Sequence, residues 1–421
     1  MSSAEQSSTT ASGAVPGQGL WRRFLLVAGP GLVVMLADTD AGSVITAAQS
    51  GAQWGYRLLL LQFVLVPILY IVQELTVRLG LVTGRGHAEL IQLHFGRFWA
   101  WFSVATLILS CVGALLSELS GLAGVGALIG VPTAVTMALV VAALLFMAYA
   151  HSYLTVERIA IAVGAFELVF LLVAWLAHPS GAEIAATATS IPVTDPKYLY
   201  LVSANIGAVI MPWMVFFQQS SIVEKRLGVG DLKAARLDTA IGALLTQLIM
   251  AAVLVAVAAT IGKSGGDQAL DTVEEIAQAI TPFLGEIGGK LLFALGMSGA
   301  ALVAAIVVSL TAARALGEIL GVNHSLAHAP REAPWFYAAY SVALIAGALV
   351  VASGANLVAL SVGVQVMNAL LLPIVLFFLF QLARRLPEPF RLKGLYALVS
   401  GAVIAVATAL GVYAGVAGLI G

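Results

Sequence analysis

The stretch Asp38-Thr39-Asp40-Ala41-Gly42-Ser43 places two carboxylates and a glycine inside an apolar run that extends from Phe24 to Ala48. An acidic side chain within a bilayer is costly, so it is by default a candidate functional residue. We expect the helix that carries this run to be interrupted here. Asp40 is the stronger candidate. Asp38 points to a different helix face and is predicted to be a helix cap or supporting residue as readily as a ligand.

The composition predicts an all-α membrane protein. Of the 421 residues, 61% are hydrophobic and 10% charged, and the mean hydropathy is +1.01, which exceeds what a soluble core of this length would bury. A net charge of -1 without a basic face argues against a nucleic-acid partner. Cys111 is the single cysteine, so neither an internal disulfide nor a cysteine-based metal cluster can form.

Segments long enough to cross a bilayer, about 20 apolar residues each, occur eleven times along the chain. They are 24–49, 55–82, 99–127, 132–150, 157–177, 199–224, 236–261, 287–316, 334–352, 356–383 and 394–418. Residues 1–23 are predicted to form a disordered cytoplasmic tail, and residues 24–418 a single transporter domain.

The distribution of basic residues predicts the orientation. With the N-terminus in the cytoplasm, all but four of the 20 Lys and Arg residues fall on the cytoplasmic side. The four exceptions are Arg57, Lys197, Lys263 and Lys290. We therefore expect a multi-pass protein of the cell (plasma) membrane whose C-terminus lies outside.

A second interruption is predicted in the sixth segment, where Gly207 and Pro212 bracket a short stretch between Asn205 and Trp213. Two breaks five segments apart suggest an inverted five-plus-five repeat, formed by 24–177 and 199–383, with 394–418 as an extra helix. The alternative is that these residues only kink the sixth helix, as Pro67 and Pro373 could kink theirs.

The chain resembles the Nramp family of divalent-metal transporters. The shared residues are Gly29-Pro30-Gly31, Asp40, Gly51-Ala52-Gln53-Trp54-Gly55-Tyr56, Gly80, Thr83-Gly84-Arg85, Ala88-Glu89-Leu90, Ser117-Glu118, Gly207-Ala208, Met211-Pro212 and Gln365. The resemblance implies a LeuT-like fold and a metal site formed by Asp40, Ser43, Ala208, Met211 and Gln365. It implies a transporter and not an enzyme, with no cofactor, no obligate protein partner, and Mg²⁺ or Mn²⁺ as the transported substrate.

Departures from the family pattern bear on mechanism. Ser43 stands where the family has Asn, and Ala41 replaces a Pro. Trp213 and Gln218 stand where the family has histidines, and Leu115 where it has an Asp; none of these three titrates near neutral pH. Transport without proton coupling is therefore expected, and Glu118 is the remaining buried acid of its segment.

The pattern is similar to that of the divergent branch of Nramp-related magnesium transporters. Mg²⁺ usually keeps several waters and takes one or two carboxylates, which suits an incomplete ligand cage. The Met211 thioether favours softer metals, and Mn²⁺ suits both settings. Two alternatives stay open: a proton-coupled Mn²⁺/Fe²⁺ importer of the ordinary type, and an amino-acid or organic-cation transporter of the same fold.

Several other polar residues carry weaker expectations. Glu167 is a lone acid within a span and is assigned either a structural partner or a role in the ion path. All six histidines are predicted in loops or at span ends: His87, His94, His151, His178, His324 and His328. Glu74 and Arg78 are expected to pair across one helical turn, and Thr272–Ala279 to form a short amphipathic helix.

Overall fold

The computed structural model describes residues 27, 29–149, 153–261, 269–280, 285–322, 330–354 and 356–420, and all secondary structure in these ranges is helical. The first half contains α2 (Pro30–Asp38), α3 (Ala41–Trp54), η1 (Gly55–Leu58), α4 (Leu59–Thr83), α5 (His87–Phe95), α6 (Arg97–Leu128), α7 (Thr133–Ala148), α8 (Tyr153–Gly164), η2 (Ala165–Leu168), α9 (Val169–Leu176) and α10 (Gly181–Thr187). The predicted tail, the side chains of His151, His324 and His328, and Lys263 lie outside the described residues.

The second half begins at the segment that was predicted to be broken. It contains α11 (Pro196–Val209), α12 (Pro212–Glu224), η3 (Val229–Asp231), α13 (Leu232–Thr260), α14 (Val273–Ile280), α15 (Glu286–Leu320), α16 (Pro334–Ala352), α17 (Leu357–Arg384) and α18 (Gly394–Ile420). Helix α14 confirms the expected amphipathic helix, with Ile276 and Ile280 buried and Glu274 exposed.

Nine helices of the described residues are long and apolar enough to cross a membrane, and α7 is a shorter apolar helix. This number is below the eleven predicted segments for two reasons. Helices α3, η1 and α4 follow one another without a gap, so that Ala41–Thr83 joins parts of the first two segments, and α7 in the predicted segment 132–150 is shorter than the other spans. Gly55, with φ of 56°, turns the chain within this run. Helix also fills each of the other predicted segments where the structure describes them.

Both predicted breaks are confirmed. Helix α2 ends at Asp38 and α3 starts at Ala41, while α11 ends at Val209 and α12 starts at Pro212. Pro212 has no backbone N–H to donate, which favours a helix start at this position. Pro67 and Pro373, by contrast, lie inside the continuous helices α4 and α17.

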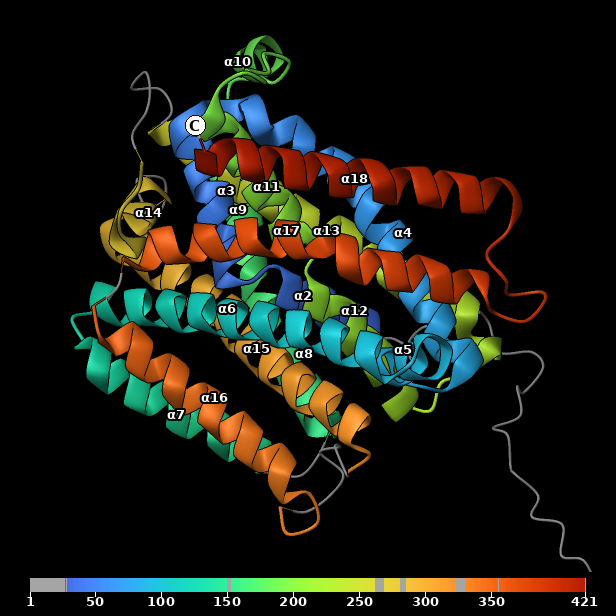
Figure 1. Cartoon of the computed structure of the whole chain (residues 1–421). Helices are drawn as coiled ribbons and strands as arrows, with labels where there is room; N and C mark the ends of the chain where they lie inside the picture. Colours follow the sequence, from blue (N-terminus) through green and yellow to red (C-terminus); the bar gives the residue numbers. More distant parts are fainter. Residues whose placement is uncertain are drawn as a thin grey trace, which may run out of the picture.

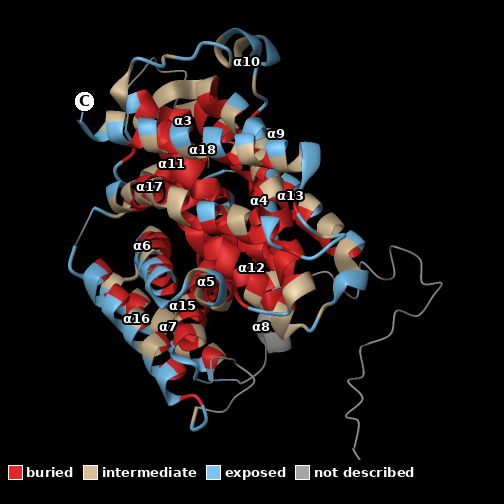
Figure 2. Ribbon diagram, turned by 45° about the vertical axis from the view of Figure 1, so that its right-hand side comes forward, coloured by how far each residue is buried: buried red, intermediate tan, exposed pale blue. Residues whose placement is uncertain are grey.

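The broken helices form the centre of the molecule. Figure 2 shows buried residues concentrated around α3, α11 and α12, whereas α16 and α7 form a peripheral pair with much exposed surface. Helix α6 packs along α15, and α11 packs against both α17 and α18, which run side by side (Figure 1). The residues at both breaks, 38–40 and 209–211, are buried within the protein, as a bilayer requires of unpaired backbone groups.

Candidate metal site at the helix breaks

The two helix breaks meet in a direct contact. The Ser43 hydroxyl on α3 donates a hydrogen bond of 3.0 Å to the carbonyl oxygen of Ala208, one residue before the end of α11. Asp40 is the N-cap of α3, and its Oδ1 accepts the backbone N–H of Ser43 at 2.6 Å. Because Asp40 is fully buried, a carboxylate, a hydroxyl and an opened-helix carbonyl lie together in the protein interior.

Helix α17 contributes Gln365 to the same place. Its side chain lies within interaction range of the Asp40 carboxylate, and its Oε1 accepts a hydrogen bond of 3.0 Å from Asn368. Two glycines permit this approach, since a Cβ at Gly42 would overlap the Gln365 amide nitrogen and one at Gly207 would overlap the Gln365 carbonyl oxygen. The structure thus brings together four of the five predicted residues: Asp40, Ser43, Ala208 and Gln365.

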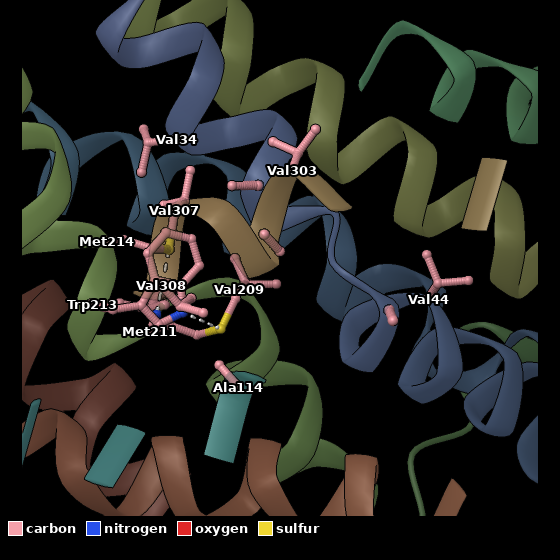
Figure 3. Packing of buried hydrophobic residues seen from close by; sticks show 14 of the residues in the cluster. Val34, Val44, Ala114, Val209, Met211, Trp213, Met214, Val303, Val307 and Val308 are labelled. Carbon is pink, nitrogen blue, oxygen red and sulfur yellow. Dashed lines mark hydrogen bonds between the residues drawn. The ribbon is translucent and has the colours of Figure 1, made fainter. Parts of the chain in front are cut away.

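Met211, the fifth predicted residue, is engaged elsewhere. It is the N-cap of α12, and its sulfur accepts the indole N–H of Trp213 at 3.1 Å. Figure 3 shows Met211 and Trp213 packed together beside Val209 and Val308. None of its described hydrogen bonds reaches Asp40. In this conformation the thioether faces an apolar cluster and an indole.

Two further acids adjoin the helix break without joining one cage. Glu118 on α6 caps α3, because its Oε2 accepts the backbone N–H of Ala41 at 2.9 Å. Glu167 in η2 is fully buried near Thr39 and Asp38, and neither of its oxygens has a hydrogen-bond donor among the described residues. No three His, Cys, Asp or Glu residues in the described ranges are placed to hold one metal ion. An ion here would depend on Asp40 and neutral oxygen atoms.

Comparison with known proteins places this arrangement in a family. The profile described as natural resistance-associated macrophage protein-like (Nramp) matches residues 31–417. The chain belongs to the Nramp family. It is 30% identical over 305 residues to a divalent metal cation transporter MntH of Mesorhizobium japonicum, and 32% identical over 307 residues to that of Bradyrhizobium diazoefficiens. These matches cover 68% of this chain and 65% and 66% of the two relatives, so the chain spans slightly less than two thirds of their length.

Solved structures agree on the fold. A crystal structure of the Eremococcus coleocola manganese transporter superposes with a TM-score of 0.80 at 19% identity, covering 99% of this chain and 92% of that one. A Na⁺-coupled sialic acid symporter superposes with a TM-score of 0.63 at 13% identity, covering 92% and 94%. This Nramp chain therefore has the predicted LeuT-like inverted repeat with an additional helix.

Several residues that support the candidate site lie in other segments, and the sequence did not predict them. Asp238 on α13 accepts the backbone N–H of Gly31 at 2.8 Å and so caps α2. The hydroxyls of Thr39 and Thr246 lie 2.5 Å apart, which ties the end of α2 to α13. The only sequence signal for Asp238 was an acid in an apolar segment, since its partner lies 207 residues away.

His87 and His94 lie in the short helix α5, where the sequence predicted a loop between the segments 55–82 and 99–127. His87 is fully buried, and its Nδ1 lies 3.0 Å from Oε1 of Gln219. Burial lowers the pKa of His87 to about 4, so the ring is neutral at physiological pH. Its surroundings, including the Phe216 ring at 4.8 Å, are those of a core residue.

A cavity of about 430 Å³ lies at one end of the broken helices, lined by Gln49, Lys197, Leu270 and Val362 among others. The Gln49 side chain closes one wall, because it donates to the Leu270 carbonyl and accepts the Leu270 N–H. This pair of hydrogen bonds holds the segment before α14 onto α3. Asp40 remains fully buried below it.

Replacing Gln49 with Ala is expected to release this segment and widen the cavity. Because Cys111 is buried, the natural chain provides a low background for thiol labelling, and Val362→Cys reports on the cavity wall. We expect labelling of Val362→Cys to accelerate about tenfold when Gln49→Ala is added, which corresponds to the loss of about 1.4 kcal/mol of hydrogen bonding. Tyr200→Phe, which removes a hydroxyl from the lining of the same cavity but no hydrogen bond of Gln49, is the control. Equal labelling rates in the Gln49→Ala and Tyr200→Phe backgrounds would show that the Gln49–Leu270 hydrogen bonds do not hold the segment in place.

Proposed function

We propose that the protein transports divalent metal cations across the cell membrane by alternating access, with Mg²⁺ and Mn²⁺ as substrates and without obligatory proton movement. The observation that carries this proposal is the meeting of a fully buried Asp40 with the Ala208 carbonyl of an opened helix, bridged by Ser43. Unwound helices of this kind coordinate cations through their backbone oxygens at the midplane of secondary transporters. The names of the two MntH relatives support the same substrate class.

The atoms available around Asp40 favour binding of hard cations. In the proposed site Asp40 supplies the charge, while Ser43, the Ala208 carbonyl and Gln365 supply neutral groups, and Met211 borders them. Oxygen ligands suit Mg²⁺ and Mn²⁺, whereas thioether sulfur selects softer metals. Since the Met211 sulfur accepts the Trp213 N–H, the set that surrounds Asp40 consists of oxygens and an amide.

This arrangement yields a test of metal selectivity. Trp213→Phe removes the indole donor and frees the Met211 sulfur, so we expect Cd²⁺ to inhibit Mn²⁺ uptake about tenfold more strongly, as a gained soft ligand would allow. The double variant Trp213→Phe with Met211→Leu retains the changed ring but lacks the sulfur, and it should return to the original inhibition. An increase that persists in the double variant would show that the ring, and not the sulfur, sets selectivity.

The proposal of uncoupled transport rests on three buried side chains that cannot carry a proton near neutral pH: Leu115, Trp213 and Gln218. Gln218 donates to the Thr239 hydroxyl at 3.1 Å and so links α12 to α13. The His87 ring is already neutral at physiological pH. None of these groups exchanges a proton when the metal site changes conformation.

Proteoliposomes with an internal pH dye separate transport from coupling. Mn²⁺ uptake without internal acidification is the expected result. Uptake accompanied by acidification would overturn the uncoupled mechanism and favour the ordinary proton-coupled Mn²⁺/Fe²⁺ importer. Calorimetric titration with Mn²⁺ against a panel of amino acids tests the other alternative, which the Asp40 charge disfavours because it repels a substrate carboxylate.

The orientation and internal division are part of this proposal. The N-terminus lies in the cytoplasm and the C-terminus outside, residues 24–177 and 199–383 form the two repeats, and 394–418 forms the extra helix. The excess of Lys and Arg on one side supports this orientation. We expect a membrane-impermeant thiol reagent to label Lys393→Cys in inverted vesicles, where the cytoplasmic side faces the reagent, and not in right-side-out vesicles.

A further inference from the structure

A basic pocket lies between α17 and α18, at the end where the two helices are joined. It has a volume of about 630 Å³ and is lined by Phe380, Arg384, Arg391, Lys393, Leu398 and Gly401, among others. Figure 1 shows α17 and α18 running side by side, with the connecting loop beyond their shared end. The helix breaks contribute no residue to this pocket, so it is separate from the proposed metal site.

The charges around this basic pocket are unbalanced. Lys393 pairs with Glu388 at 2.8 Å, whereas Arg384 and Arg391 form no ion pair with any described residue. Arg391 donates through Nε to the Arg384 carbonyl at 3.0 Å, which holds its guanidinium at the pocket while its terminal nitrogens stay available. Two uncompensated guanidinium groups therefore face one cavity, and planar guanidinium groups are well suited to bind phosphate oxygens.

One wall of the basic pocket is apolar. The Arg384 guanidinium lies 5.9 Å from the centre of the Phe380 ring, and a Cβ at Gly401 would lie 3.1 Å from that ring. Gly401 thus lets the ring rest against the α18 backbone. Leu395 and Leu398 on the first turns of α18 are 76% and 70% exposed, so an apolar surface extends from the cations along the helix.

The pocket is held in place by contacts to the rest of the molecule. The Leu392 N–H donates to the Ala383 carbonyl at 3.0 Å, and Arg78 donates to the Phe390 carbonyl at 3.3 Å. The Tyr396 hydroxyl donates to Glu74 at 2.9 Å, which fastens the start of α18 to α4. Glu74 also forms the predicted pair with Arg78 at 2.8 Å. A site fixed in this way loses little entropy when a ligand binds.

We propose that this pocket binds an anionic phospholipid, with the phosphate between Arg384 and Arg391 and an acyl chain along Phe380 and Leu398. Basic pockets between membrane helices are known to hold anionic headgroups, and here the cations lie directly beside an exposed apolar helix face. A free phosphate would satisfy the two guanidinium groups but would leave the apolar wall uncovered. The lipid matches both halves of the pocket and bridges α17 to the extra helix α18.

The test uses the full chain in nanodiscs of phosphatidylcholine, titrated with fluorescent phosphatidylglycerol. We expect the double variant Arg384→Gln with Arg391→Gln to bind the anionic lipid about thirtyfold more weakly, since each basic side chain near an anionic surface contributes about 1 kcal/mol, which is slightly more than a fivefold change in affinity. The matched control is Arg85→Gln with Arg97→Gln, which removes the same charge from two exposed positions outside the pocket. Equal affinity of the two double variants would overturn the proposal.

A second variant guards against misfolding and separates lipid from phosphate. Ala402→Trp fills the apolar part of the pocket from an exposed position and leaves all charges intact. We expect it to weaken phosphatidylglycerol binding about tenfold while competition by inorganic phosphate at Arg384 and Arg391 is unchanged. Two results would show that the site takes phosphate and not a lipid. One is that Ala402→Trp binds phosphatidylglycerol as tightly as the parent chain does. The other is that inorganic phosphate fully displaces phosphatidylglycerol when both are present at the same concentration.

Discussion

Replacing Asp40 with Asn is expected to abolish Mg²⁺ and Mn²⁺ transport in proteoliposomes. Asn retains a side-chain oxygen that can accept the Ser43 N–H, as Asp40 does at 2.6 Å, so the N-cap of α3 survives. What is lost is the charge that a desolvated cation needs. Removing one partner of a buried charge pair costs about 2–5 kcal/mol, so metal affinity measured by calorimetry should fall at least about thirtyfold.

Asp195→Asn is the matched control for this experiment. Asp195 is also the N-cap of a broken helix, α11, and accepts the backbone N–H of Lys197 at 2.8 Å, but this hydrogen bond is exposed to solvent. The two variants therefore make the same chemical change at the same kind of helix position and differ in burial and in distance from the breaks. If Asp40→Asn took up metal as fast as Asp195→Asn, the charge of Asp40 would not be needed for transport, and the proposed site would lose its basis.

The sequence could predict the position of Asp40 and of both breaks because the cost of an acid, a proline or a glycine in a bilayer is a local property. It could not predict the role of Glu118. The backbone N–H that Glu118 caps belongs to Ala41, 77 residues away, and only the packing of α6 against α3 brings them together. The roles of Asp238 and Thr246 could not be predicted for the same reason, since their partners Gly31 and Thr39 each lie more than 200 residues away in the sequence.

Met211 shows a different limit of sequence reasoning. The resemblance to the family assigned its sulfur to the metal, and the same resemblance marked Trp213 only as a residue that cannot titrate. In the structure the two residues satisfy each other, because the indole N–H of Trp213 reaches the sulfur two residues before it. A buried indole N–H needs a partner. Trp213 therefore does more than replace a titratable residue of the family: its indole N–H also binds the Met211 sulfur, which is then not available to the metal.

Among the glycines that the structure describes, Gly207 is the one where an added methyl group is expected to do the most damage. Gly207 lies in α11 two residues before its end, and a Cβ at this position would overlap the Gln365 carbonyl oxygen and lie 2.7 Å from the Ala369 backbone nitrogen. Both are backbone atoms of α17, which cannot rotate away as a side chain can. Overpacking of this kind typically costs about 1–3 kcal/mol, so the thermal unfolding midpoint in detergent should fall measurably.

The consequence for transport should exceed the loss of stability, because the displaced backbone carries Gln365 toward or away from Asp40. We expect metal uptake to fall at least tenfold even in the fraction that remains folded, as judged by size-exclusion chromatography before reconstitution. Gly363→Ala is the control on α17: its nearest neighbour would be the Tyr200 hydroxyl at 3.6 Å, an ordinary contact. If Gly207→Ala unfolds and transports as Gly363→Ala does, then α11 and α17 are not in contact at the break. Gln365 would then lie too far from the Ala208 carbonyl to share an ion with it.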